Sequence, residues 1–141
     1  MLRPSNPLVR GFDDRFFVPH SRHTGLNLKD LAAVPALRVL ASGRRTGPFL
    51  LSTENGRQIF VTGHPEYDLF TLDAEYRRDL EKGLEISVPE NYYPSDDPAQ
   101  RPINRWRSHA HLLYHNWLNY YVYQTTPYDL EELSPLAGEP R

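Results

Sequence analysis

Short stretches of alternating or continuous apolar residues predict three β-strands near the middle of the chain. Residues 37–41 alternate apolar and polar, which is typical of a half-buried strand. Residues 49–53 and 58–62 are apolar runs on either side of Asn55-Gly56. Such a pair predicts an antiparallel hairpin whose two turn residues both have positive φ. Because residues 59–61 are all bulky and apolar, we expect the last strand to be central and buried on both faces.

Helical periodicity predicts three helices. Residues 27–33 predict a short one before Pro35, and residues 71–82 a second, with Thr71 as its cap and Gly83 just past its end. Residues 104–124 predict the longest helix, because apolar residues recur there at helical spacing. Its apolar stripe comprises Trp106, Ala110, Leu113, Trp117 and Tyr120/Tyr121, and its polar stripe comprises Asn104, Ser108, His111, His115 and Asn119.

The remaining segments predict irregular structure. Residues 1–25 are rich in Pro, Gly, Arg and Asp, with a short strand expected at residues 16–18. Residues 88–102 form a proline-rich loop, and the tail from Pro127 has few packing signals, so we expect it to fray.

Composition narrows the class of protein. With 141 residues, 39% hydrophobic and 24% charged, the chain is typical of one globular domain or a large part of one. Its mean hydropathy of −0.63, and the lack of an apolar run of about 18–20 residues, argue against a membrane protein. Residues 1–10 lack the apolar stretch of a secretory signal, so we expect a cytoplasmic protein.

Charge and cysteine content exclude further classes. The net charge of −2 gives no support for nucleic-acid binding. The chain contains no Cys, which excludes disulfides, Cys-based zinc sites and a thiol nucleophile within these residues.

His64 and Glu66 form the most informative candidate site, directly after the strand at residues 58–62. An imidazole that acts as a general base needs a carboxylate to fix its tautomer and stabilise its charged form. Two residues apart on a turn, the two side chains can face one pocket. The same spacing also occurs in ordinary surface turns, so spacing alone leaves both interpretations open.

Two further positions could contact a substrate. Arg78 lies on the helix after this turn, where a guanidinium can bind a carboxylate through two hydrogen bonds. A solvated arginine paired with Glu75 or Glu81 is the alternative, and Arg77 competes for either role. Ser21 could donate a hydrogen bond in a pocket or be an ordinary loop residue.

Histidines on the last helix raise the possibility of a metal site. His111 and His115 are four residues apart, a spacing that suits zinc. No third ligand at a suitable place along the chain is evident for these two histidines or for His109. A polar helix face is therefore the favoured interpretation, and we expect no metal.

Four blocks of residues, in order along the chain, resemble the homoserine O-succinyltransferase/O-acetyltransferase family of methionine biosynthesis. They are Arg10-Gly11-Phe12-Asp13-Asp14 with Pro19-His20-Ser21-Arg22; Val61-Thr62-Gly63-His64-Pro65-Glu66-Tyr67-Asp68; Asn91-Tyr92-Tyr93-Pro94 with Asp97-Pro98; and Trp106-Arg107-Ser108-His109 with residues 116–124 and 126–130. The resemblance covers nearly all of residues 1–141.

The resemblance implies an α/β fold: the C-terminal portion of a flavodoxin-like domain similar to class I glutamine amidotransferases, with a β-hairpin and a long C-terminal helix. It implies transfer of an acyl group from succinyl-CoA or acetyl-CoA, through a Cys thioester, to the hydroxyl of L-homoserine. His64 matches the general base, Glu66 its orienting partner, Arg78 the residue that holds the homoserine carboxylate, and Ser21 a substrate-pocket position. Acyl-CoA is then a co-substrate, no cofactor is needed, and the complete enzyme is expected to be a homodimer.

The chain departs from the family in lacking the nucleophilic Cys, which precedes these blocks in the family. We therefore expect a fragment: a truncated gene, a partial gene model or one half of a split enzyme, inactive without a Cys-bearing N-terminal half. The alternative is a non-enzymatic remnant that serves as an interaction module. Either one should expose strand edges and apolar surface.

Overall fold

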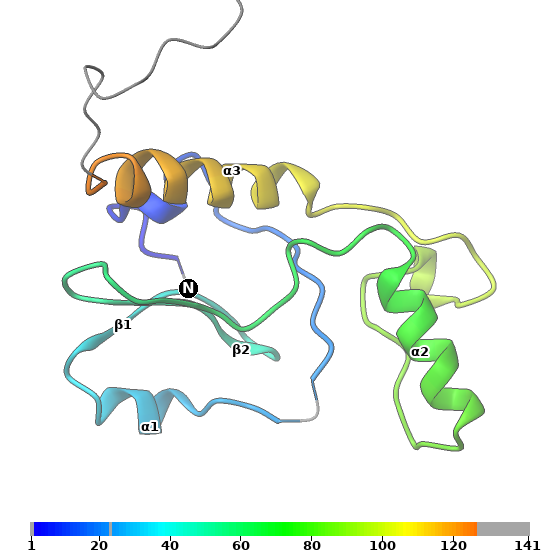
Figure 1. The fold of residues 1–141 in the computed structure, drawn as a ribbon. Coiled ribbons are helices and arrows are strands. Elements are labelled where there is room, and N and C mark those ends of the chain that lie inside the picture. Colours follow the sequence, from blue (N-terminus) through cyan, green and yellow to red (C-terminus); the bar gives the residue numbers. More distant parts are fainter. Residues whose placement is uncertain (1, 23, 127–141) are drawn as a thin grey trace, which may run out of the picture.

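The computed structural model describes residues 2–22 and 24–126 and has a mixed α/β fold (Figure 1). In chain order its elements are the 3₁₀ turn η1 (Pro7–Val9), α1 (Leu28–Ala32), β1 (Leu37–Gly43), β2 (Gly47–Thr53), β3 (Ile59–Val61), α2 (Thr71–Glu81), the 3₁₀ turn η2 (Pro94–Asp96), α3 (Arg107–Trp117) and the π-helical turn η3 (Leu118–Val122). Figure 1 shows α3 above the sheet, α1 below it, and α2 to one side. The tail from Pro127, which we expected to fray, lies outside the described residues.

The three strands form one antiparallel sheet in the order β1-β2-β3. The buried central strand is β2, in which residues 48–52 are all buried. The expectation that residues 59–61 form a central strand is wrong. Only β2 among the described strands pairs with β3, which is an edge strand whose Phe60 and Val61 remain 44% and 41% exposed. Residues 16–18, expected to form a short strand, are irregular.

The hairpin between β2 and β3 is confirmed, but its turn differs from the expected one. Gly56 has a φ of +69°, whereas Asn55 is not among the described residues with positive φ. The loop is longer than two residues: Gly56 N donates to Thr53 O over 3.0 Å, and Arg57 N donates to Asn55 Oδ1 over 3.1 Å. The Asn55 side chain therefore braces the loop, and a single glycine meets the need for positive φ.

The helix predicted at residues 71–82 is confirmed as α2, but Thr71 is not its cap. The N-cap position is Phe70, whose side chain makes no capping bond. Instead the Tyr92 hydroxyl, from the proline-rich loop, accepts from Asp73 N over 3.1 Å and donates to Leu69 O. A residue far along the chain thus satisfies a free donor of the first turn. Past the other end, Gly83 has a φ of +73°, as expected of a C-terminal glycine.

The long helix is confirmed only in part. It begins at Arg107, where Asn104 Oδ1 accepts from the backbone N–H groups of Trp106 and Arg107, and after Trp117 it widens into the π-helical η3. Its inner face also differs from the expected stripe, since Trp117 is 42% exposed and Asn116 is buried. Asn116 Nδ2 donates to the carbonyl oxygens of Leu8 and Arg10, over 3.1 and 2.9 Å, which draws it inward.

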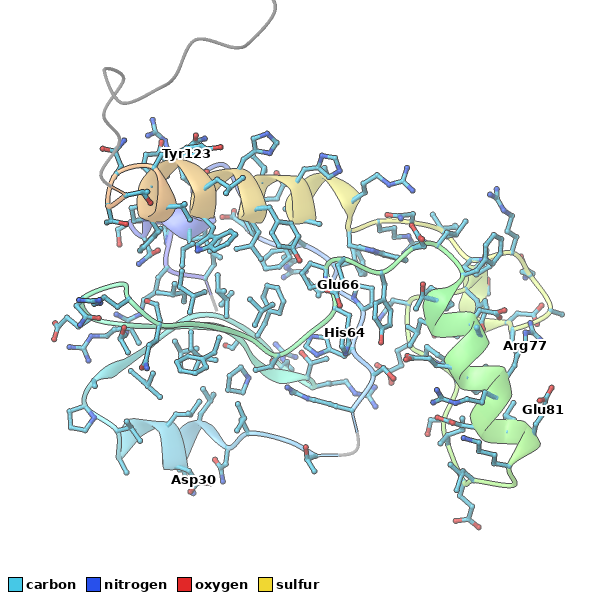
Figure 2. The ribbon with its side chains drawn as sticks, in the orientation of Figure 1. Asp30, His64, Glu66, Arg77, Glu81 and Tyr123 are labelled. Carbon is cyan, nitrogen blue, oxygen red and sulfur yellow. The ribbon has the colours of Figure 1, made fainter. Side chains whose placement is uncertain are left out.

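Two hydrophobic clusters hold these elements. The first joins the sheet, η1 and α3 and comprises Leu8, Val9, Leu40, Ala41, Phe49, Leu50 and Leu113. The second joins α2, the proline-rich loop and the start of α3 and comprises Leu72, Tyr92, Tyr93 and Trp106. In sequence, residues 62–70 connect β3 to α2, and they carry His64 and Glu66 between the two clusters (Figure 2).

Candidate active site

His64 opens a tight turn at the end of β3. Tyr67 N donates to His64 O over 3.2 Å, which closes a four-residue turn with Pro65 in its second position. His64 N donates to Pro19 O over 2.8 Å, which fastens the turn to the N-terminal segment. Gly63 lies so close to that segment that a Cβ there would meet Val18 Cγ1 at 2.9 Å. The backbone of His64 is thus set by local turn chemistry and by one long-range contact.

The His64 and Glu66 side chains meet within this turn (Figure 2). His64 Nδ1 lies 2.9 Å from Glu66 Oε1, and the two side chains are 33% and 52% exposed. With the proton on Nδ1, the imidazole donates to Glu66 and leaves Nε2 free to accept a proton. The pair has the arrangement that a general base and its orienting carboxylate require.

Tyr67 connects this pair to α2. Its ring stacks on the His64 imidazole, with centroids 4.3 Å apart, and its hydroxyl donates to Glu75 Oε1 over 2.9 Å. Burial, reinforced by Glu75 and Glu66, raises the pKa of Tyr67 to about 12. The phenol therefore stays protonated and remains a donor at neutral pH.

Arg78 and Arg77 have different partners on α2. Arg78 Nε donates to Asp79 Oδ1 over 2.7 Å, so its ion-pair partner is neither Glu75 nor Glu81, and this bond raises the pKa of Arg78. Arg77 pairs with Asp73 over 3.0 Å and donates to Pro98 O over 2.9 Å. Arg77 thus ties the helix to the proline-rich loop, whereas among the described residues no partner is bonded to the terminal nitrogens of Arg78.

The segment that carries Ser21 runs alongside the turn. The Cβ position of Gly63 is 3.0 Å from His20 Cε1, and Arg22 donates to the backbone oxygens of Thr62 and Thr46. Burial, then Arg22 and His64, lower the pKa of His20 to about 4, so its ring is neutral at pH 7. Ser21 lies between these two residues and is partly exposed.

Sequence reasoning did not single out His20, Arg22 or Tyr67 for these positions. All three belong to the blocks that carry the family resemblance. Their membership of these blocks was the signal that could have identified them, since neither spacing nor residue type distinguishes them from ordinary loop residues.

Two of the three helical histidines have other partners in the structure. His115 Nδ1 lies 2.9 Å from His111 O, and His109 Nε2 lies 3.1 Å from Asp13 Oδ2, with its ring against Phe12 and Phe16. Within residues 2–22 and 24–126, no group of three His, Cys, Asp or Glu side chains is placed to hold a metal ion.

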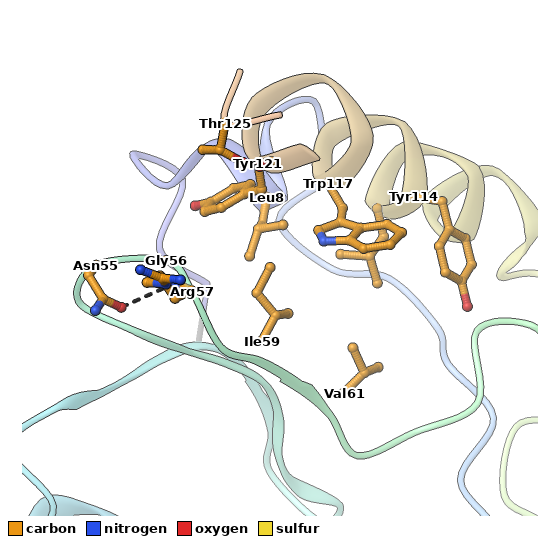
Figure 3. A pocket seen from close by; sticks show the side chains of 11 residues that line it. Leu8, Asn55, Gly56, Arg57, Ile59, Val61, Tyr114, Trp117, Tyr121 and Thr125 are labelled. Atoms are coloured by element: carbon orange, nitrogen blue, oxygen red, sulfur yellow. Dashed lines mark hydrogen bonds between the residues drawn. The ribbon is translucent and has the colours of Figure 1, made fainter. Parts of the chain in front are cut away.

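Two cavities lie near this region. The larger, about 740 Å³, lies between the β-hairpin and the C-terminal end of α3 (Figure 3). Its apolar lining includes Leu8, Ile59, Val61 and Trp117. A smaller, more polar cavity of about 210 Å³ is lined by residues that include Glu66, Tyr67, Trp106 and Tyr114. Of the pair, Glu66 lines this small cavity, so the cavity adjoins the His64–Glu66 contact.

None of the helices in the described ranges has both the length and the apolar character needed to span a bilayer.

Comparison with known proteins gives a consistent result. The model of the family described as homoserine O-succinyltransferase matches residues 1–128. The chain is 60% identical over 126 residues to a homoserine O-acetyltransferase of Desulfitobacterium hafniense, a match that covers 89% of this chain and 41% of that protein. It is 56% identical over 128 residues to the Petrotoga mobilis protein of the same name, covering 91% of this chain and 41% of that one. It is 54% identical over 133 residues to the homoserine O-acetyltransferase of Acetivibrio thermocellus, covering 94% of this chain and 44% of that protein. The chain thus spans less than half the length of these curated relatives.

Proposed function

The chain belongs to the homoserine O-succinyltransferase family, and we propose that it is the C-terminal portion of a homoserine O-acyltransferase of methionine biosynthesis. The observation that carries this proposal is the 2.9 Å contact between His64 Nδ1 and Glu66 Oε1 at the end of β3. An oriented imidazole at this position suits a reaction in which first a thiol and then an alcohol must lose a proton.

We assign the nucleophile to a Cys in a preceding N-terminal portion, because these 141 residues contain none. His64 Nε2 accepts the thiol proton, the thiolate attacks the acyl-CoA carbonyl, and the bond to the CoA sulfur breaks. CoA takes the proton and leaves an acyl-Cys thioester. His64 then accepts the proton of the homoserine hydroxyl, whose oxygen attacks this thioester. The thiolate leaves, takes up the proton again, and O-acyl-homoserine is released.

The acceptor-binding role falls to Arg78. Its ion pair with Asp79 uses Nε, so the two terminal nitrogens are the groups that would bind the homoserine carboxylate. Arg77 is less suited, because Asp73 and Pro98 O already occupy its guanidinium. Ser21, on the segment that packs beside Gly63, would supply a polar group to the same pocket.

Acyl-CoA is the proposed donor, and the names of the relatives favour acetyl-CoA over succinyl-CoA. The free edge of β3 is where we expect the Cys-bearing portion to add a strand, completing a flavodoxin-like sheet. The complete enzyme is proposed to act as a homodimer. A Cys thiolate near His64 Nε2 would complete a catalytic triad with His64 and Glu66.

Complementation tests this proposal. The chain is mixed with the part of the Desulfitobacterium relative that it does not match, in which we expect the nucleophilic Cys, and CoA release from acetyl-CoA is measured with and without L-homoserine. We expect no turnover by either part alone and homoserine-dependent turnover by the mixture. Absence of turnover from a mixture that co-sediments would refute the proposed activity.

Substitutions in the chain sharpen this test. His64→Ala should lower kcat by about 10²–10⁴-fold, the usual contribution of a general base. Arg78→Gln should instead raise the KM for homoserine and leave CoA release by the first acyl transfer intact. Arg57→Gln, on the exposed hairpin loop, is the control. Equal effects of Arg78→Gln and Arg57→Gln would remove Arg78 from the acceptor site.

A further inference from the structure

Tyr67 contacts the proposed base His64 directly, because its ring stacks on the imidazole. The Tyr67 and His64 rings are nearly parallel, with an interplanar angle of 19° and a centroid distance of 4.3 Å. The four-residue turn sets this stack, because Tyr67 N donates to His64 O and brings the first and last side chains of the turn together. Rotation of the imidazole away from Glu66 would break the stack.

Tyr67 is itself held by hydrogen bonds at its backbone and at its hydroxyl. Trp106 Nε1 donates to Tyr67 O over 2.9 Å, and the Tyr67 hydroxyl donates to Glu75 Oε1 over 2.9 Å. Tyr67 also packs against the second cluster. Tyr67 is thus fixed by hydrogen bonds at its backbone carbonyl and its hydroxyl and by packing on the second cluster. These contacts make its ring a rigid support for the imidazole stacked on it.

The hydroxyl bond extends this support to the proposed acceptor site. Glu75 and Arg78 lie three residues apart on α2, on neighbouring positions of one helix face. Arg78 also interacts electrostatically with both Tyr67 and Glu75. The ring stack and the hydroxyl bond therefore connect His64 to Glu75 through Tyr67, one helical turn from the residue that would bind the homoserine carboxylate.

We propose that Tyr67 is a positioning residue that holds the His64 imidazole in the plane that faces Glu66 and sets its distance from α2. This inference rests on the proposed role of His64 as the base. It assigns to Tyr67 no contact with substrate and no proton transfer, and the tyrosine ring and its hydroxyl have separate parts in it: the ring fixes the imidazole, and the hydroxyl fixes the ring to α2.

Nuclear magnetic resonance on this chain alone, without substrate, tests the proposal. In the unaltered chain we expect upfield-displaced His64 ring protons, cross-relaxation between the two rings, and ring nitrogen-15 shifts of a single tautomer with the proton on Nδ1. Tyr67→Phe should keep all three signatures. Tyr67→Leu should lose the displacement and give a mixture of tautomers. Tyr76→Leu, which removes a tyrosine that packs on the same cluster, is the matched control and should lower stability without changing the His64 signals.

Two outcomes would overturn the proposal. One is a folded Tyr67→Leu chain with unchanged His64 tautomer and ring-proton shifts. The other, decisive even if that variant does not fold, is the absence of ring-to-ring cross-relaxation in the unaltered chain. These measurements do not depend on acyl transfer, so the result for Tyr67 is independent of whether the proposed activity is found. In the complemented assembly, Tyr67→Leu should lower kcat by about 10–100-fold, as expected for a misplaced base, and Tyr67→Phe should stay close to the unaltered value.

Discussion

Gly63 is a residue at which the structure has little room for any added atom. A Cβ there would lie 2.9 Å from Val18 Cγ1 and 3.0 Å from both His20 Cε1 and Pro19 O. Close packing, and not backbone conformation, requires a glycine at position 63, since Gly63 is not among the glycines with positive φ. The segment that supports His64 and the segment that carries Ser21 can approach each other only because this side chain is absent.

Gly63→Ala should therefore lower the free energy of unfolding by about 1–3 kcal/mol, the usual cost of overpacking. Urea unfolding followed by circular dichroism measures the loss. Gly25→Ala is the matched control, because nothing lies within 4 Å of its Cβ position. Equal stability of the two variants would show that the 18–20 segment moves aside freely.

His20 predicts a dependence of stability on pH. Its pKa is lowered from 6.5 to about 4 by burial, by Arg22 and by His64. Between these values the unfolded chain binds a proton at His20 that the folded chain does not, so stability falls as the pH decreases through this window. After allowance for solvent screening, the loss is about 1–2 kcal/mol. Urea unfolding at pH 7 and pH 5 should show it, and His20→Gln should remove that part of the slope, whereas an unchanged slope would contradict the assignment.

At this scale, the sequence predicted that the side chains of His64 and Glu66 could meet, but not which residues surround them. His64 and Glu66 are two positions apart, so local turn geometry was enough to anticipate that they could share one pocket. The position of the Tyr67 ring depends on its contact with α2. The position of His20 depends on the packing of the N-terminal segment against Gly63. Single-sequence periodicity contains no information about such contacts, so their places beside His64 could not be foreseen.

At the scale of elements, prediction succeeded where a signal was local and failed where a distant residue decided the outcome. The hairpin, α2 and its terminal Gly83 follow from turn and capping residues. The cap of α2 comes instead from Tyr92, and β3 is an edge because of sheet order. Likewise the buried position of Asn116 is set by two carbonyl groups of the N-terminal segment.

Asn116 should accordingly be a main connection between α3 and η1. Asn116→Ala removes the donors to Leu8 O and Arg10 O and leaves these acceptors unpaired, which should cost about 1–3 kcal/mol for each buried group. Thermal unfolding compares this variant with Asn119→Ala, an exposed asparagine on the following turn. Equal midpoints would mean that water replaces the Asn116 amide.

On the scale of the whole molecule, the exposed edge of the sheet dominates the expected behaviour in solution. The edge strand β3 carries Phe60 and Val61, both more than 40% exposed. Unpaired strand edges with apolar side chains favour pairing with other chains. The expected exposure of strand edges and apolar surface is therefore found in the described residues.

The chain alone should associate as its concentration increases, and sedimentation velocity should show a rising average mass. Phe60→Lys should reduce this association, because a charge on the edge opposes pairing. Lys29→Ala on α1 is a surface control that should leave it unchanged. A single monomeric species at all concentrations would favour an independent interaction module over an incomplete sheet.

The two hydrophobic clusters divide the proposed chemistry between two regions that need not open together. His64 N is bonded to the segment that packs on the first cluster, whereas Tyr67 O is bonded to Trp106 of the second. Amide hydrogen exchange should then resolve two cooperative units, with α2 exchanging before the sheet. If the second unit opens alone, the backbone of the proposed base His64 stays on the sheet, whereas Arg78 and the Tyr67 ring that supports the imidazole move away together. The second half-reaction would need both groups, so mild denaturant applied to a completed enzyme would suppress it more strongly than the first, and the acyl-enzyme would be lost to hydrolysis.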